Sequence, residues 1–513
     1  MSRKLAAIIL MCAAAAILGL VVLRRNHPAG NQSTLTVYCA AGLKQPVEAI
    51  ARQYHEELGI KVNLQYGGTG TLLSQLQIAG QGDLFLAADD SSLTDARNRQ
   101  LIEEVVPIAV QHPVIAVPKG NPKSIRSLAD LTRDDVKLAL ANPECASISK
   151  VTRKLLEPQW LTLAAKAAVM KPTVTEIAAD LQLGAVDAAI LWDATVPQFK
   201  DLEAIEVPEL AKHRENASAA VLASCNQSPE ALKFARYLAA PDRGGKIFHQ
   251  HGFQLAGGDI WAAKPEMILY SGGVNRPAIE KLIQQFADRE GVDVTTVFNG
   301  CGILCSAMKT MENSSDPKFP DAYYACDICF VPPVAGQFPE AVMLTETDIV
   351  IAVPKGNAKN IITLADLARP GLRLGLCNAQ QSTLGFMTTA ILRSSNLLDS
   401  VRKNVVVEVP TADFLINQMR AGSLDAAIVY RVNVKLQAAH FDAIPLPSDK
   451  AKAVQPFAVR HDSPNRRLSE RLLAFLKRHP QNFEDAGFVW RGESQAVPTG
   501  QLPIPEWLKQ PQP

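Results

Sequence analysis

The chain has 513 residues, of which 47% are hydrophobic and 20% are charged, and its formal net charge is +1. This length exceeds what one hydrophobic core usually serves, and it favours two to four domains. The composition is typical of a folded globular protein. A net charge close to zero, without a long basic run, argues against a nucleic-acid partner.

The first 33 residues differ from the rest of the chain. Two basic residues precede an uncharged apolar run over residues 5–23, and Arg24 and Arg25 follow it. The run is longer than the apolar core of a usual signal peptide, lacks a good small-residue cleavage site, and is just long enough for a helix to cross a membrane. We expect residues 1–33 to form an uncleaved signal anchor, an N-terminal transmembrane helix with a spacer. A cleaved signal peptide is the alternative.

The remainder of the chain repeats itself once. The sequence IAVPKGN begins at Ile115 and again at Ile351, and DAAI begins at Asp187 and again at Asp425. The repeat is far longer than the units of about 20–50 residues that build solenoids and propellers, so each copy should be a whole domain. We place the two copies at residues 34–257 and 266–492. Residues 258–265 form the linker between them, and residues 493–513 form a Pro-rich tail.

Each copy alternates short strands and helices. In the first copy, residues 35–38 and the alternating Val62, Leu64 and Tyr66 predict strands, and a glycine-containing loop leads from each strand into a helix. This alternation predicts an α/β fold with a mainly parallel sheet. In such sheets, ligands bind at the loops that follow the carboxyl ends of the strands.

Two of these loops have the character of an anion site. They read CAAG over residues 39–42 and GGTG over residues 67–70. Free N–H groups at a helix start carry a positive partial charge, and glycine lets a ligand approach the backbone closely. Such loops can therefore hold an anion without a charged side chain. Taken alone, however, a glycine-rich turn more often simply joins a strand to a helix.

Four short segments occur in the same order in both copies. In the first copy they are AAGL from residue 40, GGTGTL from residue 67, GDLF from residue 82 and DAAILW from residue 187. In the second copy they are GGVN from residue 272, NGCGIL from residue 299, CDIC from residue 326 and DAAIVY from residue 425. As an ordered set, they resemble the periplasmic molybdate-binding protein family. The resemblance implies two tandem type II periplasmic-binding-protein domains, each with two lobes and a hinge. It also implies an extracytoplasmic protein that binds an oxyanion, molybdate or tungstate, and delivers it to the permease of an ABC-type importer.

The family holds its oxyanion in the cleft between the lobes with hydroxyl and backbone donors. The matching positions in the first copy are Gly42, Thr69, Ile148, Val174 and Trp192. The second copy has Ser271, Val274, Cys301, Ala412 and Tyr430, with Leu384 in the place of Ile148. A thiol at Cys301 is a poorer donor than the hydroxyl of Thr69, and Val274 adds a branched side chain where Gly42 is bare. We therefore expect the second copy to bind the oxyanion weakly or not at all.

The chain has nine cysteines, and four of them lie close together in the second copy. The spacing of Cys301, Cys305, Cys326 and Cys329 is compatible with disulfide bonds, buried free thiols or a soft-metal site, and it fixes no pairing. We see no nucleophile–base motif and no phosphate-binding loop, so we expect no enzymatic activity and no cofactor. Two alternative functions stay open: a membrane-tethered sensor or adaptor with a changed ligand, and a metal-handling protein that uses these cysteines.

Overall fold

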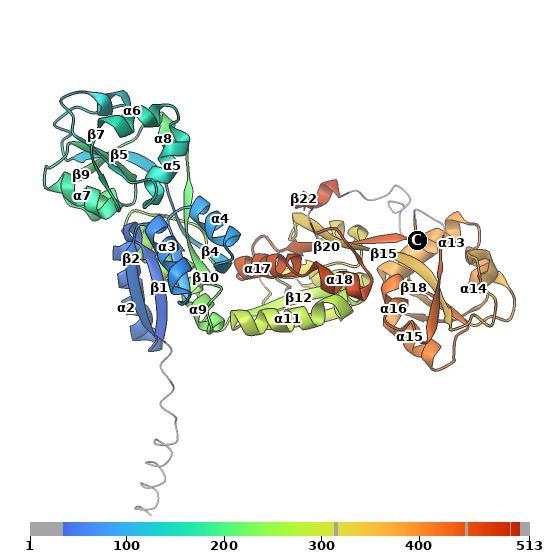
Figure 1. The fold of residues 1–513 in the computed structure, drawn as a ribbon. Coiled ribbons are helices and arrows are strands. Elements are labelled where there is room, and N and C mark those ends of the chain that lie inside the picture. Colours follow the sequence, from blue (N-terminus) through green and yellow to red (C-terminus); the bar gives the residue numbers. More distant parts are fainter. Residues whose placement is uncertain (1–33, 312–315, 447–449, 493, 503–513) are drawn as a thin grey trace, which may run out of the picture. The chain divides into compact units, whose positions relative to one another are not determined.

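The computed structural model describes residues 34–311, 316–446, 450–492 and 494–502. The chain divides between Trp261 and Ala262 into two compact units (Figure 1). The apolar run over residues 5–23 lies outside the described residues, so the membrane anchor stays a prediction. Within the described part of the chain, no helix is both long and apolar enough to cross a membrane.

The first lobe of unit one is built on a six-stranded sheet with the order β11-β4-β10-β3-β1-β2. Strands β1, β2 and β3 run parallel, and β10 runs antiparallel to its neighbours β3 and β4. The strands are β1 (Thr34–Ala40), β2 (Lys61–Gly67), β3 (Leu84–Ala87), β4 (Ile102–Gln111), β10 (Glu215–Leu222) and β11 (Gln254–Leu255). The helices are α2 (Lys44–Leu58), α3 (Thr69–Ala79), α4 (Asp90–Asn98), α9 (Ser228–Ala239) and α10 (Gly244–Gln250).

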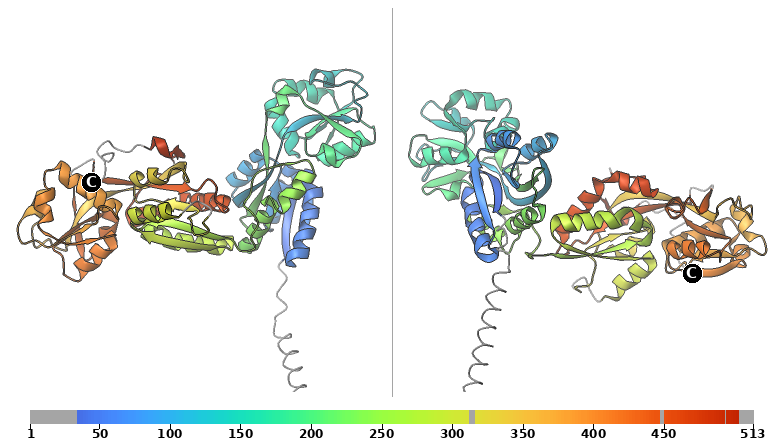
Figure 2. Two further views of the ribbon diagram at one scale, coloured as in Figure 1. Left: turned by 180° about the vertical axis from the view of Figure 1, so that it is seen from behind. Right: turned by 60° about the horizontal axis from the view of Figure 1, so that its bottom comes forward.

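Helix α2 illustrates why these segments fold as they do. Val47, Ile50 and Tyr54 recur at helical spacing and are fully buried, which gives the helix one apolar face toward the sheet. The ring of Tyr54 packs at 4.8 Å from that of Phe234 in α9. Gly59 ends α2 in the left-handed conformation, φ 72°, that glycine adopts without strain. Figures 1 and 2 show α2 lying along β1 and β2.

The second lobe of unit one is built on a five-stranded sheet with the order β7-β6-β8-β5-β9. Every residue of β6 and β8 is buried, as expected for strands covered by helices on both faces. The strands are β5 (Pro113–Pro118), β6 (Leu138–Ala141), β7 (Ala167–Lys171), β8 (Ala188–Trp192) and β9 (Leu202–Ile205). The helices are α5 (Ser147–Leu155), α6 (Gln159–Lys166), α7 (Val174–Gln182) and α8 (Pro208–Ala211).

The chain crosses between the two lobes of unit one twice. His112 separates β4 in the first lobe from β5 in the second, and the chain returns through residues 212–214 into β10. The two crossing segments are paired, because β10 runs antiparallel beside β4 from Glu215 to Leu222. Two adjacent strands that join two lobes form a hinge.

Unit two repeats this plan around one long strand. β15 (Glu340–Pro354) pairs with β20 along its first part and with β18 and β19 along its second part, so a single strand serves both lobes. The other main strands are β12 (Glu266–Gly272), β13 (Asp293–Asn299), β14 (Ala322–Tyr324), β16 (Leu374–Cys377), β17 (Val405–Val409), β18 (Ala426–Tyr430), β19 (Phe441–Pro445) and β20 (Lys452–Val459). The helices are α11 (Arg276–Glu290), α12 (Cys301–Thr310), α13 (Thr383–Ser394), α14 (Leu398–Arg402), α15 (Ala412–Arg420), α16 (Arg431–Lys435), α17 (Arg466–Lys477) and α18 (Pro480–Ala486).

The predicted α/β fold in two copies is confirmed, with one correction. The sheets are mixed and not mainly parallel, because the strands that cross between the lobes run antiparallel to their neighbours. Unit two also extends beyond residue 492. Short strands β21 (Val489–Trp490) and β22 (Val497–Pro498), the latter from the segment that we assigned to a tail, both pair with β15.

Candidate functional site

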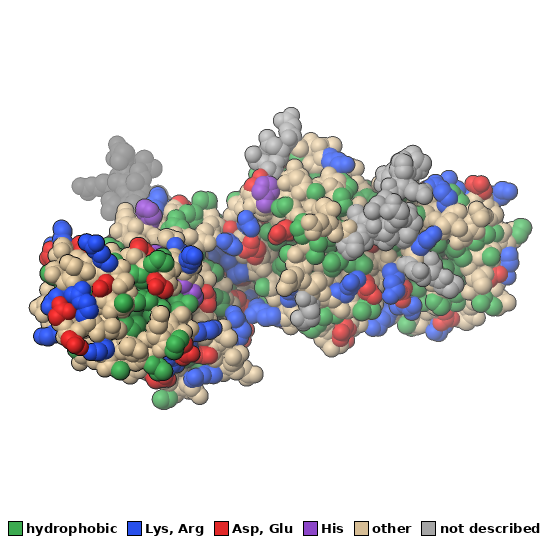
Figure 3. All heavy atoms as spheres, turned by 90° about the horizontal axis from the view of Figure 1, so that it is seen from above, with side chains coloured by type: hydrophobic (Ala, Val, Ile, Leu, Met, Phe, Trp, Pro, Cys, Tyr) green, Lys and Arg blue, Asp and Glu red, His purple; other side chains and the backbone are tan. Residues whose placement is uncertain are grey.

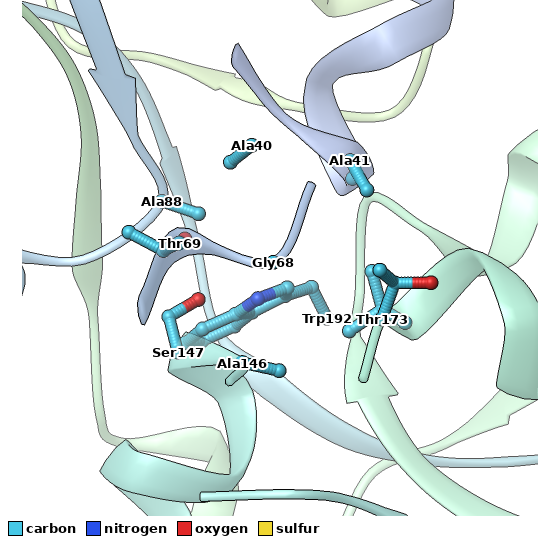
Figure 4. A pocket seen from close by; sticks show the side chains of 11 residues that line it. Ala40, Ala41, Gly68, Thr69, Ala88, Ala146, Ser147, Thr173 and Trp192 are labelled. Carbon is cyan, nitrogen blue, oxygen red and sulfur yellow. The ribbon is translucent and has the colours of Figure 1, made fainter. Parts of the chain in front are cut away.

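A pocket lies between the two lobes of unit one, with about 250 Å³ of space that includes open solvent at its mouth (Figure 4). Its walls are the loops and helix starts that follow the carboxyl ends of the strands in both lobes. The first lobe contributes Ala40, Ala41, Gly42, Gly68, Thr69 and Ala88, and the second lobe contributes Ala146, Ser147, Thr173, Val174 and Trp192.

Three helices begin at this pocket. α3 starts at Thr69, α5 at Ser147 and α7 at Val174. The residues before α3 and α5, Gly68 and Ala146, supply no capping side chain, so the N–H groups of these first turns lack a side-chain acceptor. Three helix N-termini that converge on one pocket create a positive potential without a cation.

The polar side chains in the lining of the pocket are all neutral. Figure 4 shows the hydroxyl groups of Thr69 and Ser147 on the same side of the space, beside the indole ring of Trp192. All three side chains are at least 95% buried, at 2%, 5% and 1% exposure. Among the described residues that line this pocket, none carries a charge. The arrangement suits an anion that accepts hydrogen bonds and has no proton to donate.

The lobes of unit one touch across the pocket. The backbone N–H of Gly70 donates to the carbonyl oxygen of Cys145 in the other lobe at 2.8 Å. A Cβ atom at Gly68 would lie 2.4 Å from the Cys145 oxygen and 2.6 Å from the Pro172 oxygen. Gly68 has φ −65° and ψ 144°, which any residue adopts, so the position requires glycine because of this close approach. The lobes are therefore in a closed arrangement that only a bare backbone permits.

Four of the five positions that we predicted for the first copy line the pocket: Gly42, Thr69, Val174 and Trp192. The fifth, Ile148, does not line it and is fully buried in the core of the second lobe. Ser147 lines the pocket instead, because α5 begins there and the next residue is turned toward the sheet. A hydroxyl residue at a helix start, directly after a loop that contains a proline, is the signal that could have identified Ser147 from the sequence.

The corresponding pocket of unit two has about 260 Å³ of space, again including open solvent at its mouth. Val274, Ala412 and Tyr430 line it, as the sequence predicted. Ser271 and Cys301 are fully buried behind its wall and do not line it. The lining residues that we did not predict are Gly273, Asn299, Gly300, Cys326, Ser382, Pro410, Thr411, Asp413 and Asn433.

Asp413 makes the unit-two pocket electrostatically different from that of unit one. The side-chain amide of Asn433 donates to Asp413 Oδ1 at 3.3 Å. Burial raises the pKa of the Asp413 carboxyl, and the nearby Arg276 opposes this shift. A carboxylate in the lining repels an anion, so Asp413 disfavours an oxyanion in this pocket.

The match between GDLF and CDIC was wrong. Asp83 and Asp321 occupy equivalent places, because each accepts a hydrogen bond at 2.8 Å from the backbone of the first strand in its unit, at Thr36 and Ile268 respectively. Strand β14 ends at Tyr324, so the Cys326-to-Cys329 segment follows the strand and does not lie along it. Eight cysteines lie in the described part of the chain, and all are free thiols. Within that part, no cluster of three or more metal-ligating side chains occurs.

Residues 35–254 and 268–489 each match the family of bacterial extracellular solute-binding proteins. The chain belongs to this family and contains two tandem copies of its domain. Members of this family are solute-binding proteins. Acidic and basic side chains are interspersed over the face in Figure 3, and no strongly basic surface is visible there.

Several curated relatives of the chain are molybdate-binding proteins. The chain is 27% identical over 248 residues to the molybdate-binding protein ModA of Mycobacterium tuberculosis, which covers 46% of this chain and 92% of the relative. It is 29% identical over 222 residues to a binding protein of Haemophilus influenzae, covering 43% of this chain and 90% of the relative. The solved periplasmic molybdate-binding protein of Azotobacter vinelandii aligns at 18% identity with a TM-score of 0.36, over 43% of this chain and 99% of that chain. The predicted resemblance to molybdate-binding proteins is confirmed.

Proposed function

We propose that unit one binds a tetrahedral oxyanion, molybdate or tungstate, outside the cytoplasm and delivers it to the permease of an ABC-type importer. The observation that carries the proposal is the pocket itself, where three helix N-termini and two buried hydroxyl groups converge without any charged side chain. The molybdate-binding relatives support the choice of ligand.

The protonation state of the ligand follows from the lining. Molybdate and tungstate present only acceptor oxygens at neutral pH, and the hydroxyl groups of Thr69 and Ser147, the indole N–H of Trp192 and the helix-start amides are donors. A protonated oxyanion such as hydrogen phosphate also needs an acceptor for its proton, and the lining side chains offer only hydroxyl oxygens and no carboxylate for this role. The pocket therefore favours fully deprotonated dianions over protonated ones.

The hinge between the lobes couples ligand binding to closure of the lobes. A ligand that contacts Thr69 in the first lobe and Ser147 in the second favours the closed arrangement, because only that arrangement brings both sets of donors to one anion. A permease can then distinguish the loaded protein from the empty one by its closed lobes. Residues 5–23 would keep the protein at the membrane beside this partner.

Unit two takes a different part in this proposal. Its pocket contains the Asp413 carboxylate and no hydroxyl at the place of Thr69, where Cys301 is buried behind the wall. We expect unit two to bind the same dianion at least tenfold more weakly than unit one, which corresponds to a difference of about 1.4 kcal/mol or more.

The experiment is calorimetric titration of the full chain with molybdate, tungstate and sulfate. Thr69→Val keeps the shape of the side chain and removes the hydroxyl, and it should weaken binding of molybdate by roughly 10- to 150-fold, since a hydrogen bond to a charged group contributes about 1.5–3 kcal/mol. Thr69→Ser keeps the hydroxyl and serves as the matched control. The absence of heat with all three anions for the wild-type protein would reject the proposed ligand class.

A further inference from the structure

Two cysteines of unit two lie in contact at the wall of its pocket. The sulfur atoms of Cys301, the first residue of α12, and Cys326, in the loop after β14, are 2.8 Å apart, and the backbone N–H of Cys326 donates to the Cys301 sulfur at 3.0 Å. Both side chains are buried, at 0% and 5% exposure, and Cys326 lines the pocket. Unit one has Thr69 and Ala88 at the equivalent places, so the pair is a feature of unit two.

The units also differ at a third position, where unit two has Gly272 and unit one has Ala40. A Cβ atom at Gly272 would lie 2.2 Å from the Cys326 sulfur. The backbone does not require glycine there, because Gly272 has φ −57° and ψ 136° while its counterpart in unit one, Ala40, has φ −53° and ψ 132°. Gly272 therefore serves to make room for the sulfur of Cys326, and the three positions form one structural arrangement.

The surroundings of the pair favour ionisation of one thiol. Burial opposes ionisation of Cys301, but hydrogen bonds from the Cys326 thiol, the Tyr323 hydroxyl and the Cys326 amide outweigh it and lower the pKa of Cys301. Hydrogen bonding to Cys301, together with burial, raises the pKa of Cys326. A cysteine at the first position of a helix is also stabilised as a thiolate by the helix dipole. In the folded unit, Cys301 is thus the more acidic of the two thiols.

We propose that Cys301 and Cys326 form a disulfide bond in the extracytoplasmic protein. One of the two cysteine thiolates attacks a disulfide oxidant and releases one thiolate from it, and the other cysteine then attacks the mixed disulfide and releases the second. In total, the two thiols lose two protons and two electrons, and the oxidant becomes two thiols. Because both sulfurs are buried in the folded unit, the reaction takes place while unit two folds. The inference depends on the extracytoplasmic location of the family and not on which ligand unit one binds.

The bond would alter the pocket of unit two directly. It would connect the first turn of α12 to the loop after β14, two of the elements that form the wall, and it would remove the remaining S–H donors beside the ligand space. Cys305, by contrast, contacts the carbonyl oxygen of Phe330 at 3.2 Å and the Tyr323 hydroxyl at 3.7 Å. We expect Cys305 and Cys377 to stay thiols.

The test uses the full chain, reduced and unfolded, then refolded with glutathione disulfide and digested without reductant after free thiols are alkylated. We expect a linked peptide pair containing Cys301 and Cys326, about 2 Da lighter than the sum of the two thiol peptides, while Cys377 is alkylated. Recovery of both cysteines as alkylated thiols, or of either one bonded to a different cysteine, would overturn the proposal. The proposal would also be overturned if both cysteines were protected from alkylation and a chelator, but not a reductant, removed this protection. A soft metal would then hold the pair.

Two glycine variants test the geometry without removing a cysteine. Gly272→Ala should reduce the yield of the linked pair at least fivefold, because its Cβ occupies the space of the Cys326 sulfur. Gly336→Ala is the matched control, since a Cβ there meets no atom within 4 Å. An equal yield in both variants would show that the pair does not depend on this packing. Circular dichroism of each refolded variant distinguishes a lost bond from a failure to fold.

Discussion

Replacing Gly68 by alanine should weaken ligand binding by unit one. The new Cβ would lie 2.4 Å from the carbonyl oxygen of Cys145 and 2.6 Å from that of Pro172. Both oxygens belong to the backbone of the opposite lobe, so neither can rotate away as a side chain would. Ordinary contacts between carbon and oxygen begin at about 3.3 Å, so the lobes must part by roughly 0.9 Å to admit the methyl group.

The size of the effect follows from the cost of that separation. Extra methyl groups in a tightly packed site typically cost about 1–3 kcal/mol, and here the cost applies to the closed arrangement alone. The dissociation constant should therefore rise by roughly 5- to 150-fold. The fold of each lobe should be unchanged, because Gly68 has a backbone conformation that alanine adopts without strain.

The assay is calorimetric titration of the full chain with molybdate, with thermal unfolding of the ligand-free protein as a check on the fold. Gly336→Ala is again the control. Gly300→Ala makes the equivalent change in unit two, where the new Cβ would lie 2.2 Å from the Gln381 oxygen, and it should leave the strong site unaffected. Binding of molybdate by Gly68→Ala within twofold of wild type would refute the view that closure over Gly68 holds the ligand.

Three further predictions concern unit two and the N-terminus. Burial raises the pKa of Asp327 to about 6, against about 4 in an unfolded chain. The folded state then binds more protons at this carboxyl between these values, so the contribution of Asp327 to the free energy of unfolding should fall by roughly 2 kcal/mol from pH 4 to pH 6. Asp327→Asn should flatten this slope in urea unfolding, and an unchanged slope would exclude Asp327 as its source. Asp413→Asn should strengthen oxyanion binding by unit two at least threefold in calorimetry, and unchanged or weaker binding would show that the carboxylate does not repel the ligand. Cell fractionation should find the protein in the membrane through residues 5–23, whereas a mature form that begins near residue 30 would identify a cleaved signal.

Periodicity and glycine-containing loops were sufficient to predict where strands lead into helices. Gly42 and Thr69 stand at such points, and both line the pocket of unit one. The prediction was possible because local sequence determines which residue begins a helix, and the fold brings helix starts together at one edge of the sheet.

Positions that depend on tertiary structure could not be predicted in this way. Ile148 was placed one residue away from Ser147, because a one-residue uncertainty in the start of α5 turns the side chain by about 100° around the helix axis. No pattern in the sequence pointed to Asp413. Its charge affects the pocket only because the fold places the start of α15 in the wall. The contact between Cys301 and Cys326 likewise arises from folding, as 25 residues separate them in the chain.

The number of molybdenum atoms bound per chain tests the central claim most directly. Equilibrium dialysis of the purified full chain against molybdate, followed by elemental analysis, should give one tightly bound molybdenum per chain, and Gly68→Ala should lower the occupancy at limiting molybdate. Two equivalent molybdenum atoms per chain would contradict the asymmetry between the units. No bound molybdenum at any concentration would contradict the oxyanion site of unit one.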